Sequence, residues 1–274
     1  MSRARSLAAI VAVFLALAAL APAGLTSRAD VGSGERGQAG HDRVRTRKIK
    51  RLYSDLIFPI PILILSGKVS VADIFDSTVR GRVTPVGQFE DFELVNEYFF
   101  ALASTPLSRV STITFQSLVA GGDKVAVEVD VQFKGTVGTP DFKLRQTGFY
   151  TFNDEDRVVS FDLTILNLGA AVNPKSDAER DANIEQVCGV LTVGVGHVPP
   201  TCPNEYTSYA DCVEFMHSIP YGTWDRANSN SAVCRQLHTL LTPYRPEVHC
   251  PHAGKTGGGM CIDFPYESFF DKEF

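Results

Sequence analysis

The sequence lacks the short motifs that mark several large enzyme classes. Its 274 residues contain no P-loop for nucleotides, no HExxH helix of zinc proteases and no GxSxG turn with a nucleophilic serine. Histidine is absent between residues 42 and 196, and no cysteine precedes Cys188. These absences exclude the common signatures of those chemistries, and the sequence alone does not identify a reaction.

The chain also has little net charge and no hydrophobic run long enough to cross a membrane. The formal net charge of −5 gives no general electrostatic reason to bind nucleic acid. The longest apolar run, residues 7–20, is shorter than the roughly 20 residues of a transmembrane helix. With 44% apolar and 21% charged residues, the chain can bury one or two globular cores.

The apolar run has the context of a secretory signal peptide. Arg3 and Arg5 precede it, and Ala21-Pro22-Ala23 provides the small residues of a cleavage site. We therefore predict a signal peptide over residues 1–23 and a secreted or extracytoplasmic protein without a stable membrane span. A membrane anchor is the alternative interpretation.

Residues 24–51 predict a disordered basic linker or a propeptide. Large apolar side chains are scarce up to residue 42, so this part cannot bury enough surface to order itself. A run rich in lysine and arginine follows and ends in Lys50-Arg51, a dibasic pair that resembles a propeptide processing site. A solvated basic linker, or one that rests on anionic lipid, is the alternative.

Residues 56–65 contain no polar side chain. The segment is too short to span a bilayer, and Pro59 and Pro61 oppose a continuous helix. We predict a buried extended segment here. Because a basic run lies beside it, a contact with a membrane surface is the alternative.

The middle of the chain predicts a helix and an antiparallel meander. Phe92, Val95, Phe99 and Leu102 recur at helical spacing, and acidic residues stand in the first turn, where the helix dipole favours them. The segment 125–133 alternates strictly between apolar and polar residues, which indicates a strand with one buried face. The predicted strands cover residues 79–83, 110–118, 125–133, 142–152 and 158–166. Their short connections predict antiparallel neighbours.

This order of elements resembles the nuclear-transport-factor-2-like superfamily, which includes polyketide-cyclase-like and steroid-isomerase-like enzymes. The resemblance rests on the short strand before Gly87, the helix Phe92-Glu-Leu-Val-Asn-Glu-Tyr-Phe-Phe-Ala-Leu102 and the meander, roughly residues 70–170. The superfamily opens with helices, whereas Pro59 and Pro61 stand in that region here. The resemblance implies an α+β fold: a curved antiparallel sheet with a packed helix, forming a cone whose open end holds a small apolar ligand or a catalytic Asp/His pair.

Several residues become candidates if the cone has a pocket. Gln146 and Tyr150 share a strand face and can line it, and Phe99 lies on the helix that would form a wall. Asp162 is the candidate general base of a cyclase- or isomerase-like reaction, although no histidine of the cone can pair with it. Asp130 belongs to the polar face of its strand, where we expect solvent.

Residues 171–274 predict a small helical domain held together by disulfides. Ser176-Asp-Ala-Glu179 is a capping box, Thr207 or Ser208 can cap a second helix, and Asn230 can cap a third. The residues from Pro246 onward predict a loop. All six cysteines lie here, where apolar residues are too few for a self-sufficient core. An exported chain therefore predicts three disulfides among Cys188, Cys202, Cys212, Cys234, Cys250 and Cys261, with the pairing left open.

A metal site is the rival interpretation of the same segment. Thiolates and imidazoles of Cys234, His238, His249, Cys250, His252 and Cys261 can form a mixed site if the cysteines are free. If every cysteine is bridged, His238, His249 and His252 remain as candidate ligands for zinc or copper. Otherwise no cofactor is expected.

Together these patterns predict a secreted, two-part protein. The cone-like α+β domain over residues 52–170 would bind a small apolar molecule or another extracellular protein, and the Cys-rich domain over 171–274 would cap or orient it. The missing histidine and the absence of an activated nucleophile favour binding over catalysis. Neither the ligand nor the oligomeric state can be read from the sequence.

Overall fold

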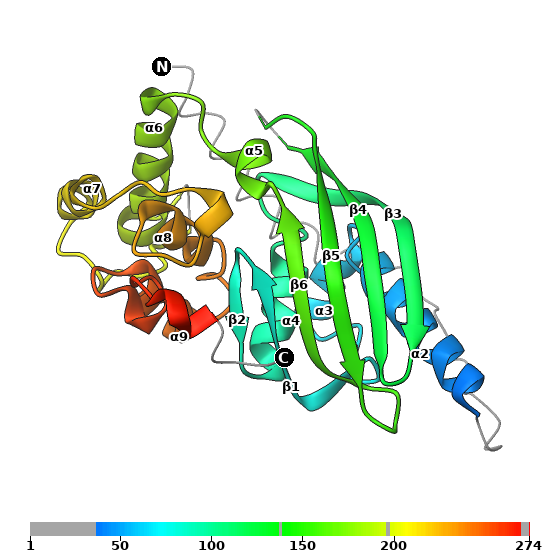
Figure 1. Ribbon diagram of the computed structural model, residues 1–274. Helices are drawn as coiled ribbons and strands as arrows, with labels where there is room; N and C mark the ends of the chain where they lie inside the picture. Colours follow the sequence, from blue (N-terminus) through cyan, green and yellow to red (C-terminus); the bar gives the residue numbers. More distant parts are fainter. Residues whose placement is uncertain (1–36, 137–138, 196–197, 270–273) are drawn as a thin grey trace.

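A computed structural model describes residues 37–136, 139–195, 198–269 and 274 (Figure 1). The predicted signal peptide and the first part of the predicted linker lie outside these residues. Among the helices of the described ranges, none combines the length and the apolar character that a bilayer span requires.

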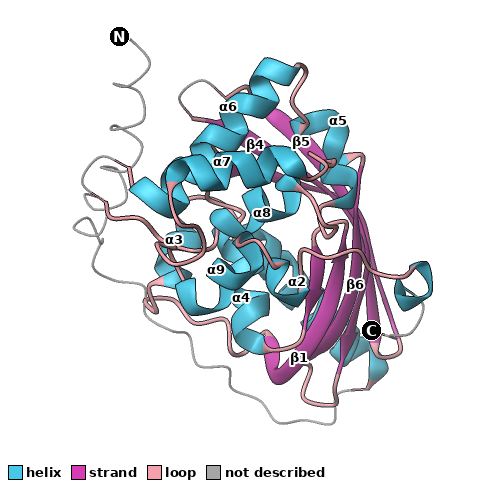
Figure 2. Ribbon diagram, turned by 90° about the vertical axis from the view of Figure 1, so that its left-hand side faces the viewer, coloured by secondary structure: helices cyan, strands magenta, loops and turns pink. Residues whose placement is uncertain are grey.

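Six strands form one curved sheet in the spatial order β2-β1-β6-β5-β4-β3 (Figures 1 and 2). The strands are β1 Phe75–Thr84, β2 Gly87–Phe89, β3 Ser108–Gly121, β4 Lys124–Gly135, β5 Phe142–Phe152 and β6 Val158–Leu166. Neighbours are antiparallel except β1 and β6, which pair in parallel. The bounds of β5 and β6 are those that the sequence predicted. The α+β class with a curved sheet and packed helices is confirmed.

Strand β4 has the buried face that its alternation predicted. Val125 and Val129 are fully buried, Val127 and Val131 nearly so, and Phe133 packs against the same core. In the register with β5, Val129 lies opposite Gln146 and Val131 opposite Leu144. Side chains of both strands therefore point to the concave side of the sheet, where the helices lie (Figure 2).

Helix α2, Gln38–Ser54, covers most of the segment that was predicted to be disordered. That prediction was wrong for residues 38–51. Ile49, Leu52 and Tyr53 are fully buried, and helix α2 packs against β3 and β4. Buried Arg45 donates to Asp156 Oδ1 (2.7 Å) and to the backbone oxygen of Asn153 (3.1 Å). Arg45 thus holds the helix on the turn between β5 and β6, more than 100 residues away in the sequence.

Residues 60–65 form a short helix, α3 (Ile60–Leu65), and not the predicted extended segment. Pro61 stands in the first turn, where its missing N–H would have had no partner within the helix. The prediction treated both prolines as interior to a helix, and this was the error. Among the described residues, helices α2 and α3 therefore precede the sheet.

Helix α4, Phe92–Ala101, packs beside α3 and β1, as its apolar spacing predicted. Asp91 caps its N-terminus by accepting from the backbone N–H of Leu94 (2.8 Å). Val95 is fully buried, and Phe99 packs against Phe161 of β6 in an edge-on contact.

The C-terminal segment is helical. Its helices are α5 Leu168–Val172, α6 Asp177–Cys188, α7 Tyr209–Ser218, α8 Ala232–Thr239 and α9 Pro246–Ala253, with short turns of other helix types between and after them. Ser176 and Ser208 cap α6 and α7 as predicted, whereas α8 is capped by Ser231 and not by Asn230. Residues 246–253 form a helix where a loop was predicted: Pro246 occupies the first position, which suits proline, and Pro251 stands inside the helix, where it removes one backbone hydrogen bond.

Three disulfides cross-link the C-terminal segment, and the prediction of three bridges within residues 188–261 is confirmed. The pairs are Cys188–Cys212, Cys202–Cys250 and Cys234–Cys261. Four of the cysteines belong to a small core of their own around α6, α7 and α9. Val233, Leu237 and Leu241, however, belong to the main core with the sheet. Helix α8 therefore connects the two cores, and packing between residues 52–170 and 171–274 is continuous.

Candidate functional site

A cavity of about 700 Å³ lies between the concave face of the sheet and the helices. Helix α4, strands β4 to β6 and the C-terminal helices α5, α6 and α8 all contribute to its wall. Six aromatic side chains line it: Phe89, Tyr98, Phe99, Phe133, Phe142 and Trp224. Aliphatic residues fill most of the remaining wall, and a few amides, among them Gln146, Asn183, Gln186 and Gln236, interrupt it. Such a cavity suits a small apolar molecule with one or two polar groups.

Two of the three predicted ligand-contacting residues line this cavity, and one does not. Phe99 and Gln146 are part of the wall. Gln146 Oε1 also accepts a hydrogen bond from the hydroxyl of Tyr53 (2.5 Å). Tyr150 lies in the core behind the wall, fully buried, and donates to the hydroxyl of Tyr53 (3.1 Å). Alternation alone could not show that a residue of the inner face would be covered by helix α2.

Asp162 lies on the opposite face of the sheet from the cavity. Phe161 and Leu163 point into the core, so the carboxylate between them points outward. Arg82 of β1 donates to it from Nε (3.0 Å). Asp162 therefore has no access to a molecule in the cavity, and the predicted role as a general base there does not fit the structure.

Asp130 is on the same outer face but is not solvated as predicted. It is only 7% exposed, because Arg145 covers it and donates to both of its oxygens (2.7 and 3.0 Å). The guanidinium of Arg145 lowers the pKa of this carboxyl. The arrangement is that of an ion pair across neighbouring strands.

The three histidines of the C-terminal segment lie together. One ring nitrogen from each of His238, His249 and His252 lies within 4.8 Å of the other two. His238 comes from α8, and the other two come from α9, whose backbone brings them to the same place one turn apart. His238 Nδ1 is 3.2 Å from His249 Nδ1. Whether these rings bind a metal stays a prediction.

Two neighbouring residues of helix α4 complete the cluster. Glu97 Oε2 lies 3.1 Å from His249 Nε2, and the other oxygen of Glu97 lies 3.5 Å from Arg245 Nε. The hydroxyl of Tyr98 lies 3.2 Å from His238 Nδ1, while its ring forms part of the cavity wall. The cluster is therefore adjacent to the cavity and separated from it by one side chain.

Sequence reasoning missed both of these residues, although the pattern of α4 contained a signal. Glu97 stands three residues after Leu94 and three before Phe100, on a face that is otherwise apolar. A carboxylate in such a position is buried, 5% exposed here, and needs a partner. That partner could not be identified because it lies 152 residues further along the chain.

Burial keeps two of the three histidine rings neutral. It lowers the pKa of His238 well below the ordinary value and that of His252 to about 4. Burial also raises the pKa of the Tyr98 hydroxyl. At neutral pH the rings of His238 and His252 are therefore uncharged, which is the form that binds metal ions.

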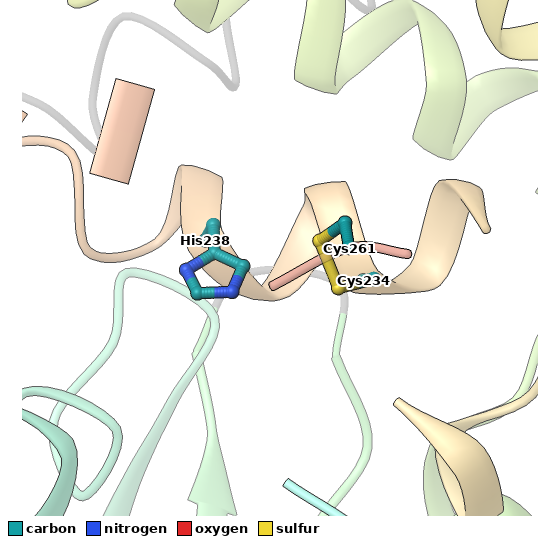
Figure 3. A group of neighbouring side chains, drawn as sticks. All are labelled: Cys234, His238 and Cys261. Carbon is teal, nitrogen blue, oxygen red and sulfur yellow. A yellow bond between two sulfur atoms is a disulfide. The ribbon is translucent and has the colours of Figure 1, made fainter. Parts of the chain in front are cut away.

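The mixed thiolate and imidazole site is not formed. Cys234 and Cys261, the cysteines beside His238, are bonded to each other, as Figure 3 shows. Cys250 is likewise bonded to Cys202. No free cysteine is found among the residues that the structure describes, so thiolates are not at hand for a metal.

Comparison with known proteins adds relatives for most of the chain. Residues 199–264 match the BfoA family C-terminal domain, a region that contains all three histidines of the cluster. The chain is 26% identical over 209 residues to "Aurasperone B biosynthesis cluster protein A" of Aspergillus niger, covering 69% of this chain and 68% of that protein. It is 27% identical over 209 residues to "Bifonsecin B biosynthesis cluster protein A" of Aspergillus brasiliensis, covering 69% and 70%.

Solved structures that are similar to part of the chain include cyclase-like and isomerase-like proteins. One is described as a SnoaL-like polyketide cyclase from Jannaschia, with 12% identity, a TM-score of 0.37, and coverage of 53% of this chain and 99% of that one. Another is a protein with a ketosteroid isomerase-like fold from Catenulispora acidiphila, with 11% identity, a TM-score of 0.37, and coverage of 45% and 88%.

Proposed function

We propose that the protein binds a small, mainly aromatic molecule in the cavity of the cone. The observation that carries this proposal is the cavity itself, whose volume of about 700 Å³ falls within the usual range of ligand pockets. Its six aromatic side chains offer stacking and edge contacts to a flat ring system. The amides of Gln146, Gln186 and Gln236 are placed to accept from or donate to a hydroxyl or carbonyl group of the ligand.

The C-terminal segment takes part in this binding. Residues of α5, α6 and α8 line the cavity together with the sheet, and Trp224 lies between α7 and α8 on the same wall. Disulfides bind α6 to α7 and α8 to the segment around Cys261, so this part of the wall is largely formed before a ligand arrives, which lowers the entropic cost of binding.

Binding outside the cytoplasm is part of the proposal. The three disulfides are consistent with an oxidising compartment, and the signal-like segment of residues 1–23 supports export. The relatives are named for biosynthesis clusters, which supports a ligand of biosynthetic origin.

Binding is favoured over catalysis by what faces the cavity. Among the described residues of its wall, the ionisable side chains are Tyr98, Lys175 and Glu179. The last two are exposed at the rim, and burial raises the pKa of Tyr98, which disfavours a phenolate at neutral pH. A general base in the centre of the cavity is therefore not available from these side chains.

The single tryptophan makes a direct experiment possible. The fluorescent naphthalene 1-anilinonaphthalene-8-sulfonate is the probe, and energy transfer from Trp224 reports its proximity. We expect saturable binding with transfer from Trp224. Replacing Ala171, a half-buried residue of the wall, with phenylalanine fills part of the cavity and should weaken binding at least about tenfold.

The matched control is Phe149→Ala on the outer face of the sheet. Phe149 is 54% exposed and lines a shallow hollow there, together with Arg82 and Asp162. If the probe affinity is unchanged by Ala171→Phe and lost in Phe149→Ala, the probe binds to the outer face of the sheet. Either that result or the absence of saturable binding would overturn the proposal.

A further inference from the structure

Hydrogen bonds within the histidine cluster do not satisfy all of its ring nitrogens. An imidazole nitrogen has one position in the ring plane, which either donates or accepts. Glu97 accepts from His249 Nε2, so in the neutral ring His249 Nδ1 carries a lone pair. That lone pair faces His238 Nδ1 at 3.2 Å, and His238 Nδ1 also faces the hydroxyl of Tyr98 at 3.2 Å.

His238 Nδ1 can satisfy only one of these two neighbours with a proton. If it donates to His249, the Tyr98 hydroxyl loses its acceptor on that ring. If it accepts from Tyr98, two lone pairs face each other across 3.2 Å in a buried site. In either case His252 adds an unsatisfied nitrogen, because its Nδ1 is buried and has no hydrogen-bond partner. A buried polar atom without a partner is costly and calls for an explanation.

We propose that His238, His249 and His252 bind one divalent transition-metal ion of the zinc or copper class. A cation placed between the rings would use the lone pairs that hydrogen bonds leave over, and imidazole is a preferred ligand of both metals. The ligand atoms would be Nδ1 of His238, of His249 and of His252. This site goes beyond the proposed binding of a ligand in the cavity and does not depend on it.

The spacing of the rings is compatible with a shared metal. Two nitrogens bound to a tetrahedral zinc at 2.0–2.1 Å are about 3.3 Å apart, close to the 3.2 Å between His238 and His249. One ring nitrogen of His252 is within 4.8 Å of a nitrogen of each of the other two rings, so His252 would move inward by about 1.5 Å to reach the same ion. As it is only half-buried, this ring can move and can admit a metal from solvent.

Glu97 is positioned to orient the ring of His249. Histidine ligands of metals usually give their other nitrogen to a carboxylate or carbonyl, which fixes the ring and makes it a better donor. Glu97 binds His249 Nε2 in this way, and Arg245 lies at the opposite oxygen of Glu97 (3.5 Å). We assign Glu97 as a positioning residue for His249.

Metal titration of the full-length, disulfide-bonded protein tests the proposal. The protein is stripped with a chelator, dialysed and titrated with Zn²⁺ in competition with a chromogenic chelator, and Cu²⁺ is titrated separately. We expect about one equivalent of tightly bound metal. His252→Ala should weaken binding at least about tenfold, and Glu97→Gln by about 10–100-fold.

Two controls separate a metal site from general damage. His217→Ala removes a half-exposed histidine of α7 outside the cluster and should leave the metal affinity unchanged. His252 is half-buried, so its loss should preserve the fold, which circular dichroism of the metal-free variant would verify. The proposal would be overturned if neither Zn²⁺ nor Cu²⁺ bound at one equivalent per protein. It would also be overturned if His252→Ala bound the metal as tightly as the unmodified protein does. Because the readout is bound metal, failure here would leave the cavity experiment unaffected.

Discussion

Replacing Leu241 with alanine tests whether the disulfide-linked segment and the sheet unfold together. Leu241 follows α8, is fully buried, and belongs to the core that contains the valines of β4. It does not line the cavity among the described wall residues, so its truncation leaves a new void. Removing a fully buried leucine side chain typically costs about 2–5 kcal/mol, the sum of lost burial and of the void.

That loss should appear in the sheet as well as in the helices. For a chain of this size it corresponds to a decrease in melting temperature of about 4–20 °C. Hydrogen exchange measured on peptides gives the decisive comparison, because it reports each segment separately. We expect peptides from β4 and β5 to lose protection together with peptides from α8.

The contrary result has a clear form. If Leu241→Ala accelerates exchange only within residues 171–264 and leaves β4 and β5 at their original protection, the two segments unfold separately and the shared core is not real. Val193→Ala is the matched control, since Val193 is 63% exposed and should change stability by less than about 0.5 kcal/mol.

Four further predictions concern the core and the bridges. Val129→Asp places a charge on a fully buried face and should cost several kcal/mol, about 3–5, in urea unfolding; a cost near zero would show that the face is exposed. Tyr53→Phe deprives the buried Tyr150 hydroxyl of its acceptor and should cost about 1–3 kcal/mol, measured in the same way. Burial raises the pKa of Tyr53 above its ordinary value of 10.0, so the native state holds this proton more tightly and stability should fall as pH rises above about 10, with a smaller fall in Tyr53→Phe. Thiol counting on the unreduced, denatured protein should find no free thiols, and four or more would contradict the three bridges.

The strands were predictable because their signal is local. The alternation in β4, and the polar turn between β5 and β6, can be read from neighbouring residues. Helix α2 was missed because its stability depends on distant partners, such as the ion pair of Arg45 with Asp156, 111 residues away. Its own composition, rich in charge, is that of a disordered segment.

In the candidate sites, too, residues with a local signal were predicted and residues that depend on distant contacts were missed. The three histidines stand within fifteen residues of each other, and this closeness was enough to single them out, although His249 and His252 were expected in a loop. Glu97 and Tyr98 approach them from 140 to 152 residues away, and no sequence spacing encodes such a contact. For Asp162, the sequence showed the alternation but not which face of the sheet would be concave.

The docking of α2 also sets an order in time for any cleavage at Lys50-Arg51. The bond that follows this pair, Arg51–Leu52, lies within helix α2, where Ile49 and Leu52 are fully buried, so a protease can reach it only when the helix is detached. Cleavage would compete with folding of the new chain and would become slow once α2 had docked. A chain that is cleaved before α2 docks would fold without Arg45, whereas a chain that folds first would keep it. Resistance of the folded protein to a dibasic-specific protease would therefore indicate that folding preceded cleavage.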